Sequence, residues 1–204
     1  MTRTDYRKKQ PTLYRASPKT PSLVRVPAMQ FVMIDGEGDP NGSPQFQESI
    51  EALYAVSYTL KFLRKFSGKG DFAVMPLEGL WWATGRAPFS LDDKKPWRWT
   101  LMIRQPDGVR GGEVKEAIAK ASAKGDRPGI ARLRPEKLTE GPAAQILHIG
   151  PYSAEGPTIE RLHGFIREQG GRPSGKHHEM YLSDPRRTTP EKLRTILRQP
   201  FKRR

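Results

Sequence analysis

Residues 177–182, His-His-Glu-Met-Tyr-Leu, hold side chains suited to chemistry in this 204-residue chain. A β-strand sends alternate side chains to opposite faces, so we expect His177, Glu179 and Tyr181 to share one face. The residues between them then suit a helix-covered core. The first set places a carboxylate between an imidazole and a phenol, groups that can take, give or orient a proton. Alternatively, Glu179 is a buried structural partner of a neighbouring arginine.

Tryptophans accompany a second carboxylate in two further strand-like segments. In residues 78–82 the same alternation groups Glu78 with Trp82 and leaves Trp81 on the other side, while Trp97 and Trp99 share a face. These rings either fill the core or line an apolar pocket with a few polar anchors. Tryptophan in strands is more often core, and which of Trp81 and Trp82 faces a pocket stays open.

Several common kinds of site lack support in the sequence. The chain has no cysteine, which excludes disulfides, thiolate metal sites and cysteine nucleophiles. His177 and His178 are adjacent, so their side chains diverge, and no third ligand follows at zinc spacing. The glycine-rich residues 36–43 lack the spacing of a phosphate loop, and no Gly-x-Ser-x-Gly elbow is present. We therefore expect no metal and no cofactor.

The net charge of +14 is concentrated at the two ends of the chain. Residues 1–25 hold seven Lys/Arg and one acidic residue, and residues 186–204 hold eight and one. The 160 residues between them hold 21 basic and 20 acidic residues. Basic ends can contact nucleic-acid phosphates non-specifically, although solvated tails explain them equally well.

Hydrophobic periodicity predicts a strand-helix-strand-strand order that occurs twice. The first half has a strand at residues 29–35, a helix at 44–66 begun by Ser43 and Pro44, and strands within 71–83 and 97–104. The second half has a strand at 143–150, a helix at about 158–169, and strands at 177–183 and 192–198. A helix at about 113–124 connects the halves, and a strand near 131–136 pairs at the junction. This order predicts an α+β protein with a mainly antiparallel sheet and helices on one face.

Three motifs resemble the GyrI-like domain family: His148-Ile-Gly-Pro-Tyr152, His177 to Arg186, and Leu77-Glu-Gly-Leu-Trp-Trp82. The resemblance covers residues 27–201. It implies a duplicated β-α-β-β unit with pseudo-two-fold symmetry and a cleft between the halves that binds small aromatic or cationic molecules. We expect a basic, flexible tail over residues 1–26 and one domain over 27–204, with halves at about 27–110 and 130–204.

The resemblance also implies roles for individual residues. Glu179 matches the glutamate that family members place in the middle of the pocket. A similar stand-alone branch hydrolyses the cyclopropane of DNA-alkylating cyclopropanoid compounds inside an aromatic cage. On that reading Glu179 is the general base and Tyr152 donates to the developing phenolate, with Glu78 as a second polar anchor. The other expected ligand-binding residues are Trp82, Trp99, Tyr58, Tyr181, Trp97 and His177.

Alternative functions remain open from the sequence. The chain is either such a hydrolase, a non-catalytic binder that sequesters or senses aromatic or cationic drugs, or an interaction protein that protects a topoisomerase. The 26 residues before the domain show no helix-turn-helix pattern, which argues against specific DNA binding. No apolar run approaches the roughly 20 residues of a membrane-spanning helix, and no secretory signal is visible, so we expect a cytoplasmic protein with no membrane partner.

Overall fold

The computed structural model describes residues 3–83, 97–125 and 127–203. The first half of the fold is formed by β2 (Met29–Glu37), α3 (Pro44–Phe66), β3 (Leu77–Ala83) and β4 (Trp97–Arg104). Ser43 accepts a hydrogen bond from the Phe46 amide and so caps α3, Pro44 occupies its first turn, and Gly68 follows its end at a φ of 74°. The predicted helix at 44–66 is therefore confirmed.

The second half repeats this order with β6 (Gly141–Ile149), α5 (Gly156–Glu168), β8 (His177–Tyr181) and β9 (Arg194–Arg203). The two halves are joined by α4 (Gly111–Ser122), η1 (Ile130–Arg132) and β5 (Arg134–Leu138). Shorter elements of the second half are η2 (Tyr152–Ala154), β7 (Gly171–Pro173) and η3 (Pro190–Lys192).

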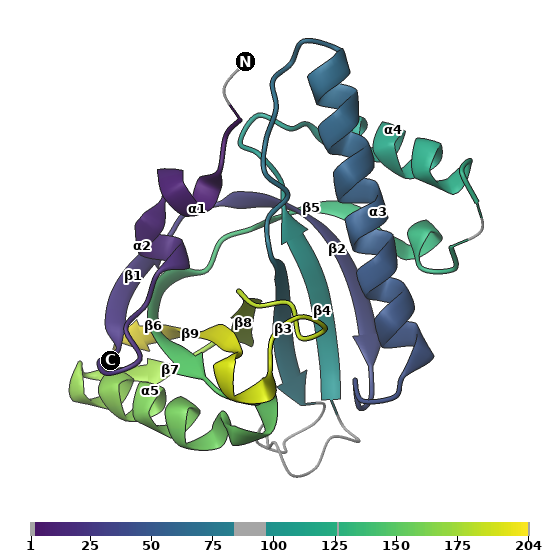
Figure 1. Cartoon of the computed structure of the whole chain (residues 1–204). Coiled ribbons are helices and arrows are strands. Elements are labelled where there is room, and N and C mark those ends of the chain that lie inside the picture. The colour runs from purple at the N-terminus through teal and green to yellow at the C-terminus, as the bar shows by residue number, and fades with distance from the viewer. Residues whose placement is uncertain (1–2, 84–96, 126, 204) are drawn as a thin grey trace.

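All the strands belong to one antiparallel network, in the order β1-β6-β9-β8-β3-β4-β2-β5, with β7 paired to β9. Figure 1 shows this curved sheet. The order β6-β9-β8 on one side of the centre mirrors β2-β4-β3 on the other, so the halves meet where β8 pairs with β3. The α+β class and antiparallel sheet are confirmed.

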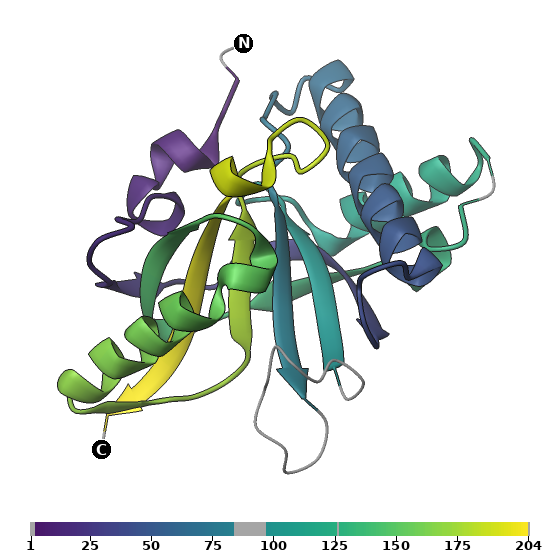
Figure 2. The ribbon, with the colours of Figure 1, turned by 60° about the horizontal axis from the view of Figure 1, so that its bottom comes forward.

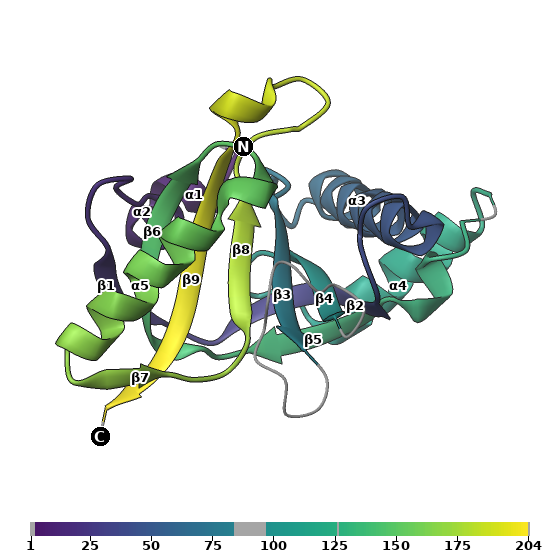
Figure 3. The ribbon, with the colours of Figure 1, turned by 90° about the horizontal axis from the view of Figure 1, so that it is seen from below.

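The two long helices cover the same face of the sheet at separate places (Figures 2 and 3). Helix α3 packs on β2 and β4, and α5 packs on β6 and β9. Under α5, Leu162 and Ile166 are fully buried against Ile146 and Leu197. Burying such aliphatic side chains contributes about 1.5–3 kcal/mol each, which anchors the helices.

The N-terminal segment differs from the flexible tail expected there. It forms α1 (Tyr6–Lys9), α2 (Pro11–Tyr14) and β1 (Ser22–Val26), and it buries Tyr6, Leu13 and Tyr14 to 4% exposure each. These helices contact the face of the sheet opposite α3 and α5, where the Tyr14 hydroxyl lies 3.3 Å from the β3 residue Glu78. The prediction that helices cover only one face thus holds for the long helices alone. The first residues cover the opposite face, where their buried aromatic side chains hold them in place.

The last part of the C-terminal basic run, residues 194–203, is likewise part of the sheet rather than a solvated tail. It forms β9, in which Arg198 is 1% exposed. Among the described residues, no helix is long and apolar enough to cross a membrane. The polar loop expected between β3 and β4 lies outside the described residues.

Candidate functional site

The centre of the candidate site is the junction of β3 and β8. Their register pairs Gly79 with Glu179 and Trp81 with His177, so Trp81 shares the Glu179 face. A side chain at Gly79 would place its Cβ 2.8 Å from Trp81 Nε1 and 3.1 Å from the Tyr181 hydroxyl. Glycine at this position therefore allows the tryptophan and the tyrosine to meet.

A chain of hydrogen bonds runs across this junction to Glu179. Trp81 Nε1 donates to the Tyr181 hydroxyl at 3.0 Å, and that hydroxyl donates to Glu179 Oε2 at 2.8 Å. His177 Nε2 lies 3.4 Å from the other oxygen, Oε1. Glu179 is 6% exposed, so these contacts fix a carboxylate just beneath the surface.

A tight turn after β6 brings two more polar groups to Glu179. His148 Nε2 lies 3.2 Å from the Pro151 carbonyl, and its Nδ1 lies 3.0 Å from the Thr158 hydroxyl. The turn also needs Gly150, whose φ is 140°. This arrangement sets the start of η2, from which Tyr152 and Glu155 extend.

Glu155 is a buried acid beside Glu179. It is 1% exposed, and its Oε1 has no hydrogen-bond partner among the described residues. Burial, followed by the negative charge of Glu179, raises the pKa of Glu155 to about 10, although the Thr195 hydroxyl acts in the opposite direction. Glu155 therefore keeps its proton at neutral pH.

Tyr152 forms the outer part of the site. Its ring meets that of Tyr181 edge to face, with centroids 5.6 Å apart, and it is 37% exposed. Burial and the charges of Glu155 and Glu179 raise the pKa of the Tyr152 hydroxyl to about 12. It is thus a hydrogen-bond donor at neutral pH.

We call these residues the Glu179 cluster: Trp81, Tyr152, Glu155, His177, Glu179 and Tyr181. Within the described ranges, no Lys or Arg forms an ion pair with either carboxylate of this cluster. No group of three His, Asp or Glu side chains in those ranges could hold a metal ion. The cluster thus brings two carboxyl groups, two phenols and an imidazole together, and such groups of interacting ionisable side chains occur often at functional sites.

Three other predicted site residues lie on or beneath α3. Trp99 is fully buried, with its ring 5.2 Å from that of Phe46, and Trp97 is 6% exposed, with its ring 5.4 Å from that of Trp81. They share a face with each other as predicted, and the strand register shows that it is the Glu179 face, but they pack in the core. Tyr58 is 48% exposed on α3.

The structure does not bring Glu78 or Trp82 to Glu179. The register of β3 and β8 places them on the opposite face, where His178 Nε2 lies 3.0 Å from Glu78 Oε2. That face is covered by the N-terminal segment with its short helices α1 and α2, and not by the long helices α3 and α5. The core expected around His178 is thus covered by helices, but its centre is a set of charged groups.

Buried charged groups form a second cluster on that face, which we call the His178 network: Tyr14, Glu78, Glu140, His178 and Arg198. His178 Nδ1 lies 3.0 Å from Glu140 Oε1, and Arg198 Nη1 lies 3.1 Å from Glu140 Oε2. Burial acts to lower the pKa of His178, but Glu140 and Glu78 outweigh it and raise the pKa to about 9.

Sequence reasoning missed two members of the Glu179 cluster. Trp81 was not among the predicted ligand-binding residues, because only the β3–β8 register shows which of the adjacent tryptophans faces Glu179. Glu155 lies inside the recognised stretch after His148, but nothing in its spacing signals burial. The sequence feature that could have pointed to Glu155 is its position just before Gly156-Pro157, at the start of α5.

The repeated β-α-β-β order and the central glutamate define a class of small-molecule-binding domains. The sequence pattern of the GyrI-like small molecule binding domain matches residues 19–202, and the chain belongs to this family. The family resemblance predicted from the three motifs is therefore confirmed.

Solved structures agree with this assignment. An uncharacterized conserved protein from Listeria innocua is 38% identical, with a TM-score of 0.90 over 98% of this chain and 100% of that one. A hydrolase from Listeria innocua is 37% identical, with a TM-score of 0.88 and the same coverage. The EcmrR C-terminal domain, at 11% identity and a TM-score of 0.55 over 91% of this chain and 98% of that one, shares the fold alone. No curated protein matches the chain in sequence.

Proposed function

We propose that this protein is a hydrolase that adds water to the cyclopropane ring of cyclopropanoid alkylating compounds at the Glu179 cluster. The observation that carries the proposal is the pairing of Glu179 with Glu155, a neighbouring carboxyl group whose pKa is raised to about 10. A buried carboxyl group that keeps its proton beside a second carboxyl group is an arrangement that acid–base catalysis uses. The 37% identity to a Listeria innocua hydrolase supports the same class of reaction.

In the proposed reaction, the water oxygen attacks a cyclopropane carbon and the ring bond to that carbon breaks. The electron pair of that bond moves into the attached dienone, whose carbonyl oxygen becomes a phenolate. Glu179 takes the proton that water loses, while Tyr181 and His177 hold the carboxylate in place. The phenolate takes up a proton, and Glu179 returns its own to solvent, so the net change is addition of one water.

Tyr152 would stabilise the phenolate as it forms. Its pKa of about 12 keeps the hydroxyl protonated, and its partial exposure leaves it accessible to a bound molecule. A donor aimed at a developing oxyanion stabilises the transition state more than the ground state. The partly exposed rings of Tyr152 and Tyr181 offer a surface on which a flat molecule can stack, whereas Trp81 is buried.

A non-catalytic binder of aromatic cations is the second candidate. It is favoured by the absence, among the described residues, of a Lys or Arg paired with the cluster carboxylates. A ligand cation could supply that charge and contact the aromatic faces. The cytoplasmic location expected from the sequence stays part of either proposal.

The test is turnover of a cyclopropanoid alkylator in ¹⁸O-labelled water, followed by chromatography with mass detection. We expect Glu179→Gln to reduce the rate by about 10²–10⁴-fold, the usual contribution of a general base. Glu160→Gln, at an exposed position on α5, is the matched control and should keep full activity. Saturable binding to the wild type without ¹⁸O incorporation would rule out the hydrolase and support the binder.

A further inference from the structure

A concave site lies on the face of the sheet opposite the Glu179 cluster. It is an open pocket of about 520 Å³ lined by side chains of β2, β3, β4 and β5 and by Lys176. Its residues are Met33, Asp35, Gly36, Glu37, Gln45, Leu80, Trp82, Arg98, Thr100, Arg134, Glu136, Leu138 and Lys176. None of these belongs to the Glu179 cluster, so the pocket is a separate site.

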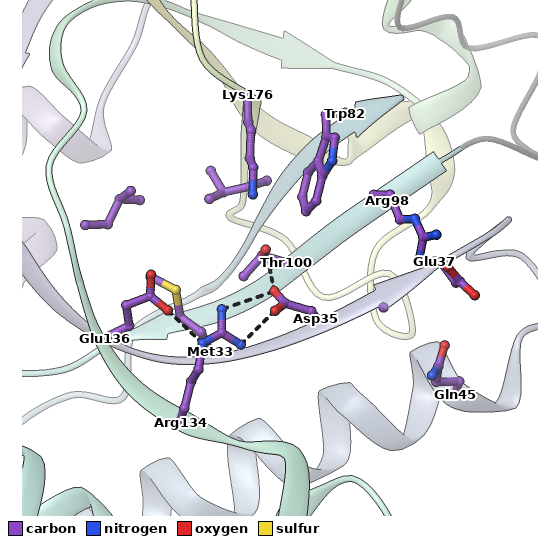
Figure 4. Close-up of a pocket in the computed structure, with 13 residues that line it drawn as sticks. Met33, Asp35, Glu37, Gln45, Trp82, Arg98, Thr100, Arg134, Glu136 and Lys176 are labelled. Atoms are coloured by element: carbon purple, nitrogen blue, oxygen red, sulfur yellow. Dashed lines mark hydrogen bonds and ion pairs between the residues drawn. The ribbon is translucent and has the colours of Figure 1, made fainter. Parts of the chain in front are cut away.

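The pocket combines an apolar end, an aromatic wall and a polar floor. Met33, Leu80 and Leu138 supply aliphatic surface, and the half-buried ring of Trp82 forms one wall. Figure 4 shows Lys176 beside that ring and the polar groups along the floor. Apolar surface with a few placed polar groups is typical of small-molecule sites.

Most charges in the pocket are already neutralised by one another. Arg134 contacts Asp35 Oδ2 at 2.9 Å and Glu136 Oε2 at 2.7 Å (Figure 4). Arg98 pairs with Glu37 across the rim. Because Arg134 is shared by two carboxylates, one negative charge of this group is left over, and it acts on Lys176 at longer range without an ion pair.

Lys176 is the exception among the described side chains that line the pocket. Its Nζ lies 3.4 Å from the centre of the Trp82 ring, and no carboxylate of the described chain forms an ion pair with it. Burial lowers the pKa of Lys176, and Asp35 and Glu136 offset this only in part. An ammonium group in such surroundings gains stability when an anion is placed against it.

We infer that this pocket binds a small organic anion with a flat, apolar body. Lys176 pairs with the anionic group, and the body packs against Trp82 and the aliphatic end formed by Leu80, Met33 and Leu138. This inference does not depend on the proposed hydrolysis, because that reaction uses residues on the other face of the sheet.

The test is isothermal titration of the full chain with three naphthalenes of the same size: 2-naphthoate, neutral 2-naphthamide and cationic 2-naphthylmethylammonium. We expect 2-naphthoate to bind the wild type saturably and the other two to bind at least about 10-fold more weakly, since a charge-assisted contact contributes about 1.5–3 kcal/mol. Lys176→Met should weaken 2-naphthoate by about 10-fold, and Lys176→Arg should retain it. Trp82→Leu should also weaken it.

Two control variants make the result decisive. Lys115→Met, at an exposed position on α4, and Glu179→Gln, on the other face, should bind 2-naphthoate as the wild type does. Thermal unfolding of each variant verifies that it is folded. Absence of saturable 2-naphthoate binding, equal binding of 2-naphthamide, or loss of 2-naphthoate binding in Glu179→Gln would each overturn the inference. The cation is compared with 2-naphthoate in Glu179→Gln, because an aromatic cation can also bind the wild type at the Glu179 cluster. Tighter binding of the cation than of 2-naphthoate in that variant would overturn the inference as well.

Discussion

The two faces of β8 carry similar groups in opposite electrostatic situations. On one face, His178 lies between Glu78 and Glu140, and Arg198 completes the set, so each buried charge has a partner of opposite sign. On the other face, Glu179 lies beside the buried acid Glu155, and neither has a Lys or Arg partner within the described residues. In the first arrangement the buried charges balance one another, so removing one of them is costly. The second arrangement leaves buried carboxyl groups without a cationic side chain, which is consistent with the proposed site.

The largest expected effect comes from breaking the His178 network. Replacing His178 with Leu leaves Glu78 and Glu140 buried without the imidazolium, so we expect the free energy of unfolding to fall by about 3–5 kcal/mol. Urea unfolding measures this. Glu179→Gln is the comparison on the opposite face and should change stability by less than about 1 kcal/mol, because it removes a charge next to Glu155. Equal losses in the two variants would contradict the distinction between the faces.

A second difference between the faces lies in the pH dependence of stability. The pKa of Glu155 is raised from its usual 4.5 to about 10 in the folded protein, so the folded state holds a proton that the unfolded state loses. The stabilisation is complete below about pH 4.5 and is lost as the pH rises toward 10. Stability therefore falls between pH 7 and pH 9, with a limiting slope on the order of 1 kcal/mol per pH unit.

Glu155→Gln tests this directly, because glutamine does not ionise. Urea unfolding at pH 7 and pH 9 should show a smaller loss of stability in the variant than in the wild type. A residual loss between pH 6.5 and 9 is expected in both proteins, since the pKa of His178 is also raised, to about 9, and the stabilisation from His178 disappears as that group deprotonates. Parallel profiles for the two proteins would show that Glu155 is ionised in the native state.

The smallest effect concerns the hydrogen bonds that hold Glu179. Tyr181→Phe removes the donor to Glu179 and the acceptor for Trp81 Nε1, so we expect a loss of about 1 kcal/mol in the free energy of unfolding. The matched control is Tyr58→Phe on the outer surface of α3, for which no loss is expected. A similar loss in both variants would show that the Tyr181 hydroxyl does not support the cluster.

Much of this fold was predictable because local signals agree with it. The Ser43-Pro44 start and the apolar spacing of Phe46, Leu53 and Leu60 are sufficient for α3, and residues 97–104 form the predicted strand. Strand alternation also separated Glu179 and Tyr181 from His178, as the structure has it. These features depend only on neighbouring residues.

The features of the fold and of the site that were not predictable depend on contacts between distant segments. Alternation alone could not show that Gly79 pairs with Glu179, which decides that Trp81 and not Trp82 faces the cluster. The basic residues of the N-terminus concealed the buried Tyr6 and Tyr14, whose burial exists only when the sheet is assembled.

The N-terminal segment is held through its backbone as well as through its buried side chains. Arg198 Nη2 donates to the Leu13 carbonyl at 2.6 Å, and Gln145 Nε2 donates to the carbonyls of Thr12 and Arg15. Every amino acid carries that carbonyl, so at the exposed position Arg15 the residue can change without loss of this contact. The consequence is a division of labour within one segment: Tyr6, Leu13 and Tyr14 depend on their side chains, whereas the carbonyl contacts depend on Gln145 and Arg198 of the sheet.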